Sequence, residues 1–118
     1  MLRTFCKSKI TKIFVTHKDM RYSGSLGIDK ALMKEADIFV GEQVHVLNMS
    51  NGERLITYAI EEDENSGKVV LYGPAVRKGE TGDELVVLTY CLLEAEDGRD
   101  LRTRHIRLGK NNRLGGEK

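Results

Sequence analysis

The sequence predicts a mainly β fold, in which a small β-barrel carries one or two short helices and a flexible C-terminal tail. About seven short segments rich in β-branched residues are separated by turn residues, which is typical of an all-β domain. Longer loops join several of these segments, and such crossing connections favour a barrel over a sandwich. The chain has 118 residues, so we expect a single core.

Two strands are expected at the start of the chain, over residues 2–10 and 12–17, because β-branched residues alternate there in part. A polar turn over residues 18–24 then leads into a short strand over residues 25–28. The sequence Ser-Gly-Ser therefore lies where the turn gives way to this strand.

A helix of about two turns is expected next, with Asp29 as its N-cap, since a carboxylate accepts hydrogen bonds from the free amides at a helix start. The helix is expected to run through Asp37, and Gly41 lies beyond its end. Three apolar residues fall on one face at helical spacing: Leu32, Met33 and Ala36.

A β-hairpin is predicted over residues 43–60, because Asn51 and Gly52 tolerate the positive φ of a tight turn between two alternating segments. A brief apolar strand over residues 68–71 follows, and Gly73-Pro74 ends it because proline has no amide to donate. The strongest apolar run lies within residues 84–93, which predicts a buried strand there.

The composition changes at residue 94, so we divide the chain into a barrel domain over residues 1–93 and a basic, flexible tail over residues 94–118. The 25 residues of the tail include four glycines. They also include five cationic residues with no acid among them, Arg102, Arg104, Arg107, Lys110 and Arg113.

The charge balance argues against nucleic acid or an anionic membrane as a partner, because 19 Lys and Arg stand against 18 Asp and Glu. No apolar run has the roughly 18 residues of a membrane helix, and the start of the chain does not resemble a signal peptide. We therefore expect a cytoplasmic protein.

A metal site is not expected. Cys6 and Cys91 are far apart in the sequence, and the three histidines, His17, His45 and His105, are isolated. A metal needs three or four converging donors, so each histidine is interpreted as solvated or hydrogen-bonded within the fold. Phosphate-binding loops, nucleophile elbows and Cys-x-x-Cys spacing are also missing from the sequence.

Four sequence features occur together. They are Lys9, the segment Tyr22-Ser23-Gly24-Ser25, the hairpin Asn51-Gly52-Glu53-Arg54-Leu55-Ile56-Thr57-Tyr58 and the loop Gly73-Pro74-Ala75. In this combination the chain resembles the aspartate decarboxylase family over roughly residues 1–93. The resemblance implies a six-stranded double-psi β-barrel that assembles as a homotetramer. It also implies decarboxylation of L-aspartate to β-alanine and CO2 in pantothenate and coenzyme A biosynthesis.

In this family the cofactor is a pyruvoyl group derived from a serine of the chain itself, which the resemblance assigns to Ser25. The hydroxyl of Ser25 would attack the carbonyl of Gly24, where no Cβ hinders the approach. Elimination and hydrolysis would then leave chains 1–24 and 25–118, with the pyruvoyl group at the start of the second. That group would form a Schiff base with the substrate amine.

The remaining site residues also come from the resemblance. It assigns Tyr58 as the proton donor and Thr57 as a substrate-binding residue that also assists self-cleavage. The guanidinium of Arg54 suits a substrate carboxylate, and Lys9 adds a second positive charge. The other expected substrate-binding residues are Tyr22, Gly73, Pro74 and Ala75.

Several of these residues also fit ordinary structural roles. Arg54 suits a cross-strand salt bridge, Tyr58 and Thr57 suit a strand, and Lys9 and Tyr22 suit solvation and packing.

Two positions depart from the family: Thr11 stands where histidine is common, and Tyr72 where asparagine is common. An accessory maturation factor serves some relatives. The alternative is a β-barrel interaction module that does not mature and that uses its Arg-rich tail.

Overall fold

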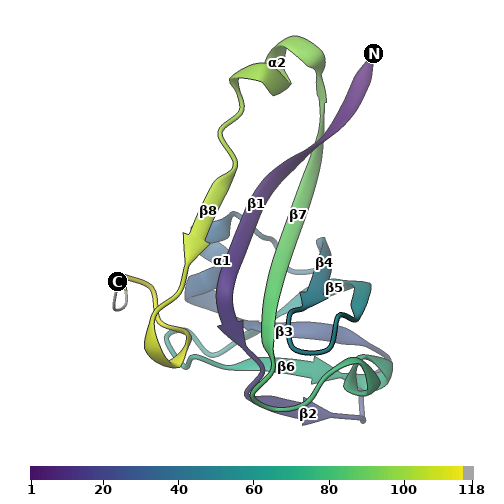
Figure 1. The fold of residues 1–118 in the computed structure, drawn as a ribbon, viewed down its shortest axis with the longest axis vertical. Helices are drawn as coiled ribbons and strands as arrows, with labels where there is room; N and C mark the ends of the chain where they lie inside the picture. The colour runs from purple at the N-terminus through teal and green to yellow at the C-terminus, as the bar shows by residue number, and fades with distance from the viewer. Residues whose placement is uncertain (116–118) are drawn as a thin grey trace.

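The structure is a computed structural model that describes residues 1–115, and it is mainly β (Figure 1). Eight strands form one mixed sheet in the order β2-β6-β3-β5-β4-β7-β1-β8. The strands are β1 (Leu2–Phe14), β2 (His17–Asp19), β3 (Ser25–Asp29), β4 (Gln43–Asn48), β5 (Arg54–Glu62), β6 (Val69–Tyr72), β7 (Glu84–Glu94) and β8 (Arg104–Arg107). The helices are α1 (Lys30–Ala36), α2 (Ala95–Asp100) and the 3₁₀ turns η1 (Gly73–Lys78) and η2 (Lys110–Asn112).

The long antiparallel pair of β1 and β7 rises away from the rest of the sheet, with α2 at its far end (Figure 1). We expected two strands where the structure has the single strand β1. Lys12, at a φ of 60°, lies in an unpaired irregularity of β1, and the pairing with β7 resumes at Ile13. Shifts of register at residues 6–8 and 10–13 absorb the irregularity, because a bulge lets a strand bend while its neighbour continues.

The local predictions in the middle of the chain are confirmed. Strands β4 and β5 form the expected antiparallel hairpin, and β6 ends at Tyr72, directly before Gly73-Pro74. The carboxylate of Asp29 caps α1 by accepting from the amide of Ala31, and it also accepts from the amides of Asn65 and Gly67. This side chain therefore ties the helix start to the loop before β6.

The core is aliphatic and lies on one face of the strands. Every residue of β3 is buried, and β4 alternates buried and partly exposed side chains. The alternation defines two faces for the strands β5, β4, β7, β1 and β8: an inner face toward the core and an outer face away from it. The core residues without exposed surface are Ile10, Ile13, Leu26, Ile28, Ala36, Val44, Val46, Ala59, Val69 and Val87.

Regular structure occupies residues 95–115 in place of the flexible tail that we expected. Strand β8 pairs in parallel with β1, and Leu108 is buried in the core. A Cβ on Gly98 of α2 would lie 2.0 Å from the ring of Phe5, so the helix packs closely on β1. Composition alone did not reveal this packing, because the partners lie at the other end of the chain. Residues 116–118 of the expected tail lie outside the described residues.

Asn112 joins the C-terminal segment to the core. Its side chain is buried, accepts from the amide of Phe14, and donates to the carbonyls of Phe14 and Gly67. None of the helices within residues 1–115 is long and apolar enough to cross a membrane.

We expect Asn112→Ala to lower the free energy of unfolding by about 2–3 kcal/mol, because it removes three buried hydrogen bonds of about 1 kcal/mol each. The measurement is urea unfolding at fixed protein concentration, with Lys110→Ala as a control on an exposed side chain. Equal stability of the two variants would show that the C-terminal segment does not contribute to the fold.

Candidate functional site

Ser25 is the first residue of β3 and is 1% exposed. Gly24 before it has a φ of 135°, a conformation that residues with a side chain rarely adopt. Strand β6 pairs antiparallel with β3 and sets Tyr72 directly opposite Ser25. The Gly24–Ser25 bond therefore lies where a strained turn meets a fully buried strand.

Gly73 allows the chain to come close to this bond. A Cβ on Gly73 would lie 2.2 Å from the carbonyl oxygen of Tyr22 and 2.7 Å from the amide nitrogen of Gly24. The φ of Gly73 is 60°, so a side chain there would also strain the backbone. Pro74 follows, and its Cδ lies 3.5 Å from the position of a Cβ on Gly24. Gly73 and Pro74 thus hold the segment that precedes Ser25.

A cleft of about 320 Å³ opens beside this bond, and we call it the Gly24 cleft. Four predicted site residues line it: Gly24, Thr57, Pro74 and Ala75. Lys78 also lines it, and its ammonium group forms an ion pair of 2.9 Å with Glu53. Lys78 was not among the predicted residues. A lysine in a loop sequence does not by itself indicate which cleft its side chain lines.

Tyr72 holds its hydroxyl away from the Gly24–Ser25 bond. The phenol donates a hydrogen bond of 2.7 Å to Glu62 on β5, and its ring packs edge-on against Tyr22 with centroids 4.7 Å apart. The pair crosses β3 above Gly27, where a Cβ would lie 2.1 Å from the Glu62 carboxylate. Burial, together with the hydrogen bond to Glu62, raises the pKa of Tyr72 well above its usual value, so the phenol stays neutral.

Three predicted site residues lie on the outer face instead. Lys9 pairs with Leu88, Arg54 with Leu47, and Tyr58 with Gln43, and none of the three lines the Gly24 cleft. Lys9 lines a separate cavity of about 420 Å³. Within residues 1–115 neither Lys9 nor Arg54 forms an ion pair, so the salt bridge considered for Arg54 does not occur there.

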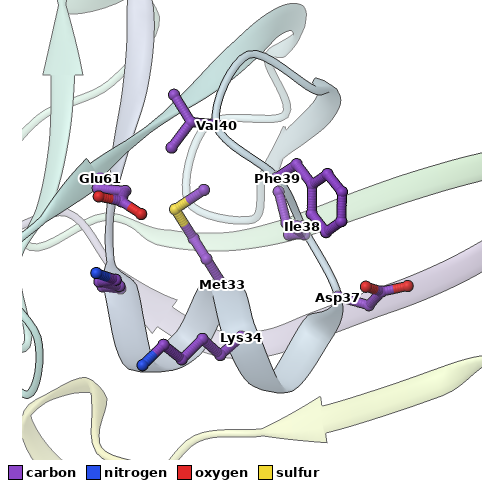
Figure 2. A pocket seen from close by; sticks show the side chains of 8 residues that line it. Met33, Lys34, Asp37, Ile38, Phe39, Val40 and Glu61 are labelled. Carbon is purple, nitrogen blue, oxygen red and sulfur yellow. The ribbon is translucent and has the colours of Figure 1, made fainter.

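A larger cavity, about 590 Å³, lies elsewhere and is lined by none of the predicted site residues (Figure 2). It lies at the end of α1, and Phe39, which lines it, is 73% exposed. The lining residues are Lys30, Met33, Lys34, Asp37, Ile38, Phe39, Val40 and Glu61. No cluster of three or more metal-ligating side chains occurs in the part of the chain that the structure describes.

Comparison with known proteins agrees with the motifs. The family model for aspartate decarboxylase matches residues 1–115. Aspartate 1-decarboxylase of Coxiella burnetii is 47% identical over 94 residues, which cover 80% of this chain and 85% of the relative. Aspartate 1-decarboxylase of Thermoanaerobacter pseudethanolicus is 39% identical over 113 residues, 96% of this chain and 97% of the relative. The Acaryochloris marina protein of the same name is 42% identical over 97% of this chain and 87% of its own length.

Proposed function

Since the chain belongs to the aspartate decarboxylase family and decarboxylates L-aspartate to β-alanine, we propose that it first cuts itself between Gly24 and Ser25. The observation that carries the proposal is the buried Ser25 behind Gly24, with Gly73 packed against the same turn. Gly24 has no Cβ, so its carbonyl carbon is open to attack, and its positive φ of 135° is one that a residue with a side chain would rarely adopt.

The cut needs only groups of the chain and one water molecule. The hydroxyl oxygen of Ser25 attacks the Gly24 carbonyl carbon, and the peptide bond is exchanged for an ester. Loss of the Ser25 α-proton then expels the Gly24 carboxylate and leaves a dehydroalanine. Water adds to this residue and ammonia leaves, so chain 25–118 begins with a pyruvoyl group. The group consists of the atoms of Ser25, so it needs no binding site beyond the position of that residue.

The surroundings of Ser25 fit such a group. The Gly24 cleft lies next to the bond, and glycine, proline and alanine leave room for a small substrate. The ketone carbon of the pyruvoyl group would bond to the substrate amine. The group would then accept the electron pair that remains when CO2 leaves the substrate. Arg54 and Tyr58 do not line this cleft, so they would reach the substrate from a second copy. There Arg54 would hold a substrate carboxylate by two parallel hydrogen bonds, and Tyr58 would give a proton to the carbon that lost CO2. Thr57 and the backbone of residues 73–75 orient the substrate, and Tyr22 closes the turn before Gly24.

We also propose that the active form is a homotetramer of cleaved protomers with the double-psi barrel of the family. The separate positions of Lys9 and the Gly24 cleft support a second copy, because one protomer does not bring them into one cavity. The outer face supports it too: Ile56 is 56% exposed and Leu92 is 62% exposed. Nδ1 of His45 on this face is buried without a hydrogen-bond partner within residues 1–115.

The match to the aspartate decarboxylase family over residues 1–115 argues against the interaction-module alternative. Arg104 and Arg107 of its Arg-rich tail belong to the paired strand β8, where their side chains stay exposed. Tyr72 still differs from the asparagine that is common in the family at this position. This difference bears on the rate of self-cleavage and not on whether the protein is an enzyme. An accessory maturation factor would act on that rate.

We expect Ser25→Ala to abolish both the cut and the release of CO2 from aspartate, because the hydroxyl is the attacking group and the source of the ketone. Denaturing mass spectrometry is the measurement, with Ser66→Ala as a matched control that is cut normally. Fragments that end at Gly24 in the Ser25→Ala variant would rule out this mechanism.

Gly73→Ala is expected to slow the cut by about tenfold or more, which corresponds to about 1.4 kcal/mol in the barrier. The added Cβ would collide with Tyr22 and Gly24 and move the bond away from the Ser25 hydroxyl. The control is Gly82→Ala, since Gly82 has a φ of 95° but no atom within 4 Å of a Cβ. Equal rates for the two variants in a time course of fragment formation would contradict a special role for Gly73.

Tyr72→Asn is expected to mature faster than wild type. A compact amide at residue 72 can donate to the Gly24 carbonyl, whereas the phenol donates to Glu62. Tyr72→Phe is the control, because it removes the hydroxyl and keeps the bulk of the ring, and we expect it to remain slow. The readout is the fragment fraction over time at matched temperature. No gain in Tyr72→Asn would show that the phenol does not limit the cut.

A further inference from the structure

Strand β8 brings an imidazole and a guanidinium to the side of Lys9. The parallel register sets His105 opposite Lys9 and Arg107 opposite Thr11. Nε2 of His105 lies 3.1 Å from the hydroxyl oxygen of Thr11, which is within hydrogen-bond range. All four residues line the cavity of about 420 Å³ on the outer face, which we call the Lys9 cavity.

The Lys9 cavity has an apolar floor and a basic rim. Leu47, Val86 and Leu88 form the floor from β4 and β7, with Met49 at its edge. Three cationic groups and one imidazole surround it, namely Lys9, Lys12, Arg107 and His105, while Glu84 is the single acid in the lining. Glu84 already pairs with Lys12 at 3.5 Å, so it does not neutralise the other three.

Lys9, His105 and Arg107 therefore share a cavity without an acidic partner among residues 1–115. Neighbouring positive groups repel, and a bound anion with two oxygens relieves that repulsion and accepts their hydrogen bonds. The Thr11 hydroxyl engages Nε2 of His105, which leaves Nδ1 as the ring nitrogen that can meet a ligand.

We propose that His105 and Arg107, with Lys9, bind a carboxylate group of the substrate diacid. Arg107 provides the planar fork for two oxygens, and His105 provides a ring nitrogen that can hydrogen-bond to an anion. The aliphatic floor suits the short carbon chain between two carboxylates. This inference rests on the proposed function, because the cavity acts on the substrate only if a second copy brings it to a Gly24 cleft.

The probe is succinate, a four-carbon diacid without an amine, which binds as the substrate does but does not react. Isothermal titration calorimetry on the cleaved protein measures its Kd at one fixed pH. The charged groups that line the cavity with His105 are Lys9, Lys12, Glu84 and Arg107.

We expect His105→Ala to weaken binding several-fold, because it removes a hydrogen-bonding group from the cavity. Arg107→Gln should weaken binding about tenfold, which is the loss of a charge-assisted pair. Two controls remove a histidine and a cationic side chain outside the cavity and should bind as wild type does: His17→Ala and Lys110→Gln.

Steady-state kinetics give the second readout. His105→Ala should raise KM for aspartate with the cleaved fraction unchanged. A Kd for succinate and a KM for aspartate equal to those of wild type in both His105→Ala and Arg107→Gln would overturn the proposal. Failure of the proposed function looks different: the wild-type chain would then stay uncut after Gly24, whatever the affinity for succinate.

Discussion

Gly73 touches the turn before Ser25 so closely that a Cβ there would lie 2.2 Å from Tyr22 and 2.7 Å from Gly24. This contact requires strand β6 to end at Tyr72 and the chain to turn at Gly73-Pro74, which places Pro74 and Ala75 in the wall of the Gly24 cleft. It also holds Gly24 at a positive φ while β3 and β6 pair on the other side of the bond. Two glycines at positive φ thus flank the approach to one peptide bond, next to a serine that the core buries.

The site residues lie in separate places of one copy. The Gly24 cleft collects residues from the turn before β3, from β5 and from η1, whereas the Lys9 cavity lies on the outer face of β4, β7, β1 and β8. The two linings have no residue in common. The proposed site between copies would bring the two together, and it would give the exposed apolar residues of the outer face a partner surface.

Local signals accounted for the parts of the fold that the sequence predicted well. Asn51-Gly52 marks a hairpin, Asp29 caps a helix and Gly73-Pro74 ends a strand, each through its own backbone preferences. Strand β8 was missed because it exists only by pairing with β1, nearly a hundred residues earlier. The family motif supplied the members of the Gly24 cleft, but the position of Lys9 in another cavity depends on strand register, which composition does not reveal. His105 was set aside as isolated for the same reason, although it lies directly opposite Lys9.

Mixed oligomers test most directly whether the site is shared between copies. Ser25→Ala provides an intact Lys9 cavity without the cut, and Lys9→Gln provides a cut Gly24 cleft beside a defective cavity. Co-expression with two affinity tags isolates oligomers that contain both variants, and the measurement is their rate of CO2 release at low aspartate. We expect a share of the sites to regain the wild-type KM, because an intact cavity from one copy meets an intact cleft from the other. Activity no greater than that of the unmixed Lys9→Gln protein would contradict a shared site.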